Sequence, residues 1–307
     1  MTILANPELW ASTLSMAVPL ALPAIGGTFS ERTGVVNIAM EGIMLIGAFF
    51  GVAFSYWTGN AWIGLLMALI IGGLVSAAFA WGAIRVSADQ VVLGMAVNIF
   101  AAGLTAFLLD TVFGFSGTPT TTPKLPNVKS IPGIDQIPFV GKIFENQSIL
   151  VYIMILLVIL SHWFLFHTRL GLRMRSVGEH PLAADTVGVN VWRLRYTGVI
   201  IGGLLSALGG AYLSIGVLNS FSVNMTNGRG YIALAAMIFG KWTPFGSFGA
   251  ALLFGFSTAL GIALQGQGIS SNILQMIPYA LTILALAGLV GRSNPPAADG
   301  IPYEPKR

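Results

Sequence analysis

The chain has 307 residues, of which 55% are hydrophobic and 8% are charged, and its formal net charge is +4. Because a soluble domain carries roughly 25% charged residues, this composition excludes an ordinary soluble protein and indicates an integral membrane protein. The absence of cysteine excludes disulfides, thiolate metal sites and cysteine nucleophiles, and the small basic excess is typical of cytoplasmic loops rather than of nucleic-acid binding.

We predict an all-α, polytopic membrane bundle of about 8–10 transmembrane helices, forming one transmembrane domain over residues 1–307. A spanning helix needs about 20 apolar residues. The runs of suitable length are 9–27, 38–57, 61–84, 91–113, 148–166, 196–218, 245–264 and 273–291. A further run, 231–240, is too short to span alone and is either a half-helix or part of a broken span. Counting it as a crossing gives nine.

The basic residues predict the orientation of these spans. With the N-terminus outside, the loop 114–147 is extracytoplasmic, and the loop 167–195 and the tail 292–307 are cytoplasmic. Most of the fifteen basic residues then lie on the cytoplasmic side, as the positive-inside rule requires. A re-entrant 231–240 would instead place the basic tail outside. The short runs Arg32-Thr33-Gly34 and Arg229-Gly230 fall on opposite sides, which is compatible with an inverted internal pseudo-symmetry.

Three ionisable residues fall inside the predicted spans: Glu41, Asp110 and His162. Because an ionised group is costly in the bilayer, such residues usually face the protein interior or water. Glu41 follows Asn37 by four residues, which on a helix would place both on one face. The pair either lines a substrate pathway or makes a fixed hydrogen bond or ion pair between helices. Asp110 and His162 lie near span ends and are interpreted as interfacial.

Two uncharged polar residues, Gln90 and Asn98, are eight positions apart and share one face of a predicted helix. They either meet a polar solute in the pathway or join neighbouring helices by hydrogen bonds.

The cytoplasmic loop 167–195 contains five arginines and the run from Glu179-His180-Pro181 to Gly188. Proline suits the first turn of a helix and glycine its end, so one or two short surface helices are expected there. The sequence contains no phosphate-binding loop of the Walker A type, no Gly-x-Ser-x-Gly elbow and no His-Glu-x-x-His motif. If transport by this chain uses ATP, another polypeptide must hydrolyse it.

Four ordered blocks resemble the bacterial ABC importer permeases of the branched-chain amino acid and ribose type, and most closely the nucleoside subgroup. The blocks are FSERTGVVNIAMEG at 29–42, ADQVVLGMAVN at 88–98, the run 170–190 and NMTNGRGYIALAAMIFG at 224–240, with a weaker match at 275–282.

The resemblance implies a permease subunit in the bacterial inner membrane that is not itself an enzyme. It implies a second permease subunit, a cytoplasmic ATPase that holds ATP and Mg²⁺, and an extracytoplasmic solute-binding protein, with no cofactor in this chain and no nucleic-acid partner. Nucleosides are the expected solute, followed by simple sugars and branched-chain amino acids. The remaining alternatives are a stand-alone secondary carrier or channel and, least favoured, a membrane-embedded enzyme.

The resemblance also implies that part of the cytoplasmic loop couples to the ATPase. The residues concerned are Glu179, His180, Pro181, Ala183, Ala184, Asp185 and Gly188. The better-known importers carry Glu-Ala-Ala followed by glycine, whereas this chain has Ala183-Ala184-Asp185, so the geometry of the contact cannot be transferred. The alternative is an ordinary basic loop that touches lipid headgroups. The predicted pathway residues are Asn37, Glu41, Gln90 and Asn98.

Overall fold

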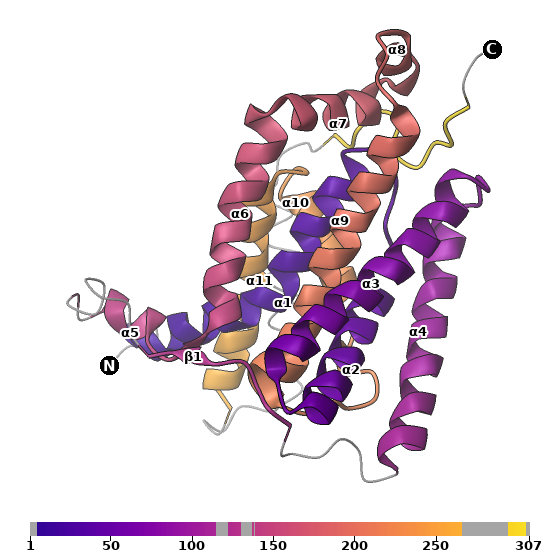
Figure 1. The fold of residues 1–307 in the computed structure, drawn as a ribbon. Coiled ribbons are helices and arrows are strands. Elements are labelled where there is room, and N and C mark those ends of the chain that lie inside the picture. The colour runs from indigo at the N-terminus through magenta and orange to yellow at the C-terminus, as the bar shows by residue number, and fades with distance from the viewer. Residues whose placement is uncertain (1–4, 115–121, 130–136, 138, 266–293, 305–307) are drawn as a thin grey trace.

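The computed structural model describes residues 5–114, 122–129, 137, 139–265 and 294–304 (Figure 1). Within these residues, seven helices are long and apolar enough to cross a membrane, which confirms the predicted all-α membrane bundle. They are α1 (Pro7–Glu31), α2 (Met40–Thr58), α3 (Ala61–Ile84), α4 (Gln90–Phe113), α6 (Ile149–His167), α9 (Val191–Ala211) with its π-helical continuation η2 (Tyr212–Leu218), and α11 (Pro244–Ala263). The predicted span 273–291 lies outside the described residues.

Shorter elements connect the long helices. They are α5 (Val140–Phe144), α7 (Arg169–Glu179), α8 (Pro181–Thr186) and α10 (Arg229–Phe239). A two-residue strand β1 (Asn127–Val128) pairs antiparallel with β2 (Gln147–Ser148) and closes the loop between α4 and α6. The expected surface helices of the loop 167–195 are therefore present as α7 and α8.

Polar caps set several helix starts. The Asn6 side chain accepts a hydrogen bond from the Glu8 amide at 3.0 Å, and Asp89 accepts from two amides in the first turn of α4 at 2.9 Å. Thr243 caps α11, and Pro244 occupies its first turn. Each cap satisfies amides that have no partner within their own helix.

The helices α1 and α9 pack against each other in the centre of the bundle, with α11 and α6 against α1 and with α2 and α3 against α9 (Figure 1). Their backbones approach closely at Gly26 and Gly202, where a Cβ on Gly26 would lie 2.6 Å from the Gly202 carbonyl oxygen. Close backbone approach through small residues is how membrane helices gain packing contacts without a hydrophobic driving force. This explains part of the high glycine content.

Two predicted boundaries are wrong in instructive ways. The span expected at 196–218 begins at Val191, because Arg195 is 1% exposed inside the helix rather than part of a solvated loop. The span expected at 38–57 begins at Met40, so Asn37 precedes the helix. The helical spacing argument that placed Asn37 and Glu41 on one face therefore does not apply.

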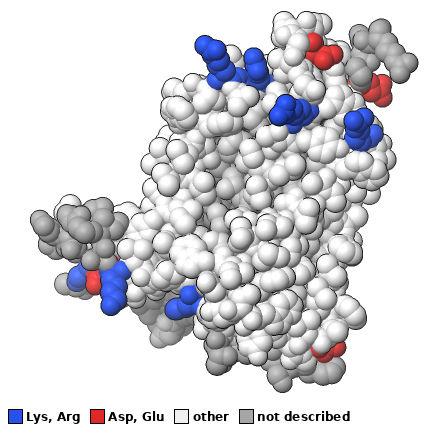
Figure 2. Space-filling model, in the orientation of Figure 1, with Lys and Arg blue, Asp and Glu red and all other residues white. Residues whose placement is uncertain are grey.

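The charged side chains visible in Figure 2 gather at the two ends of the molecule and leave the middle uncharged. The larger group of basic side chains lies at the end formed by α7 and α8. An uncharged belt between charged ends is the surface expected of a chain that spans a bilayer.

Candidate pathway and coupling sites

Glu41 lies in the first turn of α2 and caps the start of α10. Its Oε1 accepts hydrogen bonds from the Thr226 hydroxyl at 2.7 Å and from the Gly228 amide at 2.8 Å, and its Oε2 accepts from the Gly230 amide at 2.6 Å. The side chain is 7% exposed. A carboxylate at the N-terminus of a helix is stabilised by the unpaired amides and by the helix dipole.

Two glycines make this approach possible. Gly228 has φ = +80°, a conformation that is unstrained only for glycine. A Cβ on Gly230 would lie 2.5 Å from the backbone nitrogen and Cα of Glu41. The block 224–240 therefore contains glycine where α10 meets α2, which explains the Gly-Arg-Gly sequence in physical terms.

Asn98 joins three segments. Its Oδ1 accepts from the Gly42 amide at 2.8 Å, while its Nδ2 donates to the Ile38 carbonyl at 3.0 Å and to the Tyr231 hydroxyl at 2.9 Å. Its side chain therefore ties α4 to the start of α2 and to α10. Tyr231 was not among the predicted site residues, although it lies in one of the four blocks.

Gln90 and Asn37 complete the predicted pathway set. The Gln90 Oε1 accepts from the Val36 amide at 2.7 Å, so Gln90 and Asn98 reach the same connecting segment, 32–39 and the start of α2, from one side of α4. Asn37 lies in that segment and is fully buried, and neither of its side-chain polar atoms has a hydrogen-bond partner among the described residues. Buried amides without partners are uncommon in native proteins.

The other two ionisable residues lie apart from this cluster. Asp110 is exposed near the end of α4. His162 is half-buried in α6, where its ring stacks on Phe166 and lies 4.3 Å from the Phe245 ring centroid.

The predicted coupling residues fall on α7, α8 and the turn that follows. The helix α8 begins at Pro181, and Gly188 adopts φ = +79° after its end. Ala184 is buried against Val177, Val191 and Tyr303, whereas the remaining predicted positions, Pro181 excepted, are exposed: Glu179, His180, Ala183, Asp185 and Gly188.

Two apolar side chains within the predicted range 181–188 add to this exposed face. Leu182 is 41% exposed and Val187 is 78% exposed. Leu182 lies on α8, and Val187 lies in the turn directly after it. The sequence of so short a helix does not reveal which of its faces is buried.

The C-terminal segment 294–304 packs against α7, α8 and the start of α9. The Ala298 amide donates to the Gly178 carbonyl at 2.8 Å, and the buried Arg195 donates from Nη1 to the Ile301 carbonyl at 2.8 Å. The Tyr303 ring is buried and meets Trp192 edge-on with centroids 6.0 Å apart. The segment therefore joins α7, α8 and α9.

Acidic groups lie inside this contact. Burial raises the pKa of Asp299 from 3.8 to about 7, although its hydrogen bond with Glu31 and the positive charge of Arg195 oppose the shift. Glu179 contacts the same segment, because its Oε2 accepts from the Ala297 amide at 3.1 Å. Its Oε1 also lies 3.9 Å from Nη1 of Arg32.

Comparison with known proteins decides the family. Residues 9–286 match the family model described as "Branched-chain amino acid transport system / permease component". The chain belongs to this permease family.

Curated relatives cover nearly the whole permease. It is 45% identical over 303 residues to the guanosine ABC transporter permease protein NupQ of Bacillus subtilis, with 95% of each chain covered. It is 42% identical to the nucleoside ABC transporter permease protein NupC of Lactococcus lactis, again with 95% of each covered. A putative glucose ABC transporter permease, TsgC13 of Haloferax volcanii, is 33% identical over 95% of this chain and 87% of its own.

These relatives establish the class of the protein. It is a multi-pass membrane permease subunit of an ABC transporter, and such subunits are not themselves enzymes. The absence of a Walker A sequence agrees with a division of labour in which a separate subunit hydrolyses ATP.

Proposed function

We propose that this permease imports nucleosides. The observation that carries the proposal is that the two relatives more than 40% identical to it are named for guanosine and nucleosides, while the relative named for glucose is more distant.

The partners are a second permease subunit, a cytoplasmic ATPase that binds ATP and Mg²⁺, and an extracytoplasmic solute-binding protein. The helix α8 and the turn after it support the ATPase contact, because Leu182 and Asp185 are exposed on the helix and Val187 is exposed in the turn. Its buried side packs on Tyr303 and α9, so a force on α8 is transmitted to a central helix of the bundle.

The pathway runs beside the junction where the start of α2 meets the start of α10, each of which follows a non-helical connection. Transporters commonly place their substrate site where helices are interrupted, and Asn37, Glu41, Gln90 and Asn98 all lie around the connecting segment 32–39 and the start of α2. Asn37 supports this location, because its amide has unused donors and acceptors that suit a polar solute. ATP binding on the partner would rock the bundle and open this region to alternate sides.

The test is reconstitution with and without partners. Liposomes that contain this permease, its partner permease and the ATPase should take up labelled guanosine when the binding protein and ATP are supplied, and vanadate should abolish uptake. Labelled glucose is the matched control solute and should not accumulate. Glucose uptake without guanosine uptake would reassign the substrate, and guanosine uptake by this chain alone would indicate a secondary carrier.

A further inference from the structure

The helix α7 lies across the ends of α6 and α9 rather than parallel to them (Figure 1). Its inner side is buried through Met174 and Val177, while Leu170 and Leu172 are more than half exposed beside the exposed Arg173. Exposed leucines and arginines on one short helix at the ends of two membrane helices are typical of a helix at the bilayer interface.

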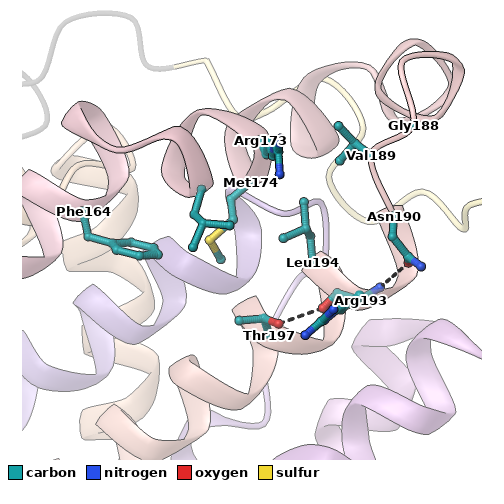
Figure 3. Close-up of a pocket in the computed structure, with 10 residues that line it drawn as sticks. Phe164, Arg173, Met174, Gly188, Val189, Asn190, Arg193, Leu194 and Thr197 are labelled. Carbon is teal, nitrogen blue, oxygen red and sulfur yellow. Dashed lines mark hydrogen bonds between the residues drawn. The ribbon is translucent and has the colours of Figure 1, made fainter.

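A cavity of about 470 Å³ lies beneath α7, between α6 and α9. Phe164 from α6, Met174 from α7 and Leu194 from α9 form the apolar part of its lining (Figure 3). Arg173 enters from α7 and Arg193 from the first turn of α9, and Leu194 lies between them in this view.

The cavity is positively charged and amphiphilic. The residues that line it include both arginines and no carboxylate. Among the described residues, neither arginine has a carboxylate within ion-pair distance. Guanidinium groups match the geometry of phosphate oxygens, which they bind through paired hydrogen bonds.

Exposed apolar side chains continue along α6 before the cavity residue Phe164. Leu160 lies one turn before Phe164 and is 47% exposed. A bound inorganic anion would leave this apolar surface unused, whereas an amphiphile would place its charged group between the arginines and its chain along α6. Basic pockets between membrane helices at this level match the headgroups of anionic lipids.

We propose that this cavity binds the phosphate headgroup of an anionic phospholipid from the leaflet at the α7 end, with Arg173 and Arg193 holding the phosphate. Under the proposed membrane orientation this leaflet is the cytoplasmic one. Lipid binding at the cavity does not depend on which solute the permease carries.

The experiment uses the full-length permease with its partner subunits in detergent. Native mass spectrometry would compare phosphatidylglycerol with phosphatidylcholine of the same acyl chains. We expect the wild type to prefer phosphatidylglycerol and the double variant Arg173→Gln, Arg193→Gln to lose roughly fivefold in affinity for each arginine removed. The Arg173→Lys, Arg193→Lys variant should keep most of the preference. Arg169→Gln removes the same charge from α7 outside the cavity and should change little.

A second variant distinguishes the effect of the cavity's shape from the effect of its positive charge. Thr197 lines the cavity. Thr197→Phe fills part of the cavity and keeps both arginines, so it should also weaken phosphatidylglycerol binding. Wild-type binding by Thr197→Phe, or an equal loss in Arg169→Gln, would overturn the proposal. Full displacement of the lipid by millimolar inorganic phosphate would show a free-anion site instead. Loss of ATPase association in the double variant with an unchanged lipid preference would make the ATPase the occupant.

Discussion

Glu41 joins the start of α2 to the start of α10. Its carboxylate accepts three hydrogen bonds, from the Thr226 hydroxyl and from the Gly228 and Gly230 amides. Glu41→Gln should lower the Tm, because the amide group of glutamine replaces one of the two acceptor oxygens with a donor, which then faces either the Gly230 amide or the Gly228 amide. Loss of a hydrogen bond to a charged group costs about 1.5–3 kcal/mol. If Glu41 also lies on the pathway, nucleoside uptake per folded transporter should fall as well. Normal uptake per folded molecule would restrict its role to capping.

Gly230 provides a sterically defined test of the same contact. Gly230→Ala would force a Cβ to within 2.5 Å of the Glu41 backbone, so the two segments must separate. We expect a loss of stability of about 1–3 kcal/mol, as for other overpacked sites. Gly249→Ala is the matched control, because nothing lies within 4 Å of its Cβ position on α11. Equal thermal unfolding of the two variants would contradict the close packing of α10 on α2.

The sequence indicated Glu41 as a site residue, but it did not indicate the hydrogen-bond partners of Glu41. Glu41 stood out because a carboxylate inside an apolar span is expensive. Its partners are the Thr226 hydroxyl and the Gly228 and Gly230 amides, all 185 or more residues away, and no local pattern encodes such a contact. Arg195 was assigned to a cytoplasmic loop, whereas it is buried in α9. Its guanidinium donates to the main-chain carbonyl of Ile301, and a main-chain partner leaves no signal in the sequence.

At the scale of elements, α8 presents two different faces. The chain contains no cysteine, so single cysteines can be placed on each face without background. Leu182→Cys and Val187→Cys should cross-link to cysteines on the ATPase surface. Ala184→Cys should not, because Ala184 is 4% exposed and packs on Tyr303 and Val177. Cross-linking from Ala184→Cys alone would show that α8 docks through its other side, and failure at every position would remove it from the ATPase interface.

The docked C-terminal segment should respond to pH. Because docking raises the pKa of Asp299 from 3.8 to about 7, the docked state holds its proton more tightly than the free state. Docking is therefore strongest at the acid end and weakens as pH rises from about 4 through 7. Glu31 and Arg195 face the same carboxyl group and are unchanged in the test. Hydrogen exchange at 294–304, corrected for the intrinsic rate, should show less protection at pH 8 than at pH 6.

Asp299→Asn is the control for this prediction. Asparagine keeps the size of the side chain and removes its titration, so the pH dependence of protection should flatten. The same slope in the variant and in the wild type would assign the effect to another group.

Elements with a strong apolar pattern were predicted well. The long helices agree with their predicted spans to within a few residues at most ends, because 20 apolar residues in sequence leave few other structures in a membrane. The docking of 294–304 was not predicted. This segment has no periodicity, and its order depends on partners in α1, α7 and α9.

At the scale of the whole molecule, the basic residues at the α7 and α8 end imply a fixed orientation in the membrane (Figure 2). The loop that contains α5 lies at the opposite end of the bundle (Figure 1). From the positive-inside rule we propose that the α8 end lies in the cytoplasm, with the N-terminus outside and the segment 294–304 inside.

Cysteine labelling of intact cells tests this orientation. Lys142→Cys on the exposed side of α5 should react with a membrane-impermeant maleimide added from outside. Val187→Cys and Glu304→Cys should react only after the membrane is opened, because both are exposed at the other end. The outcome at Glu304 also tests the uncharacterised span 273–291. If 231–240 were re-entrant, residue 304 would be labelled from outside while residue 187 stayed protected. Protection of both positions is the outcome expected when 231–240 and 273–291 each complete a crossing.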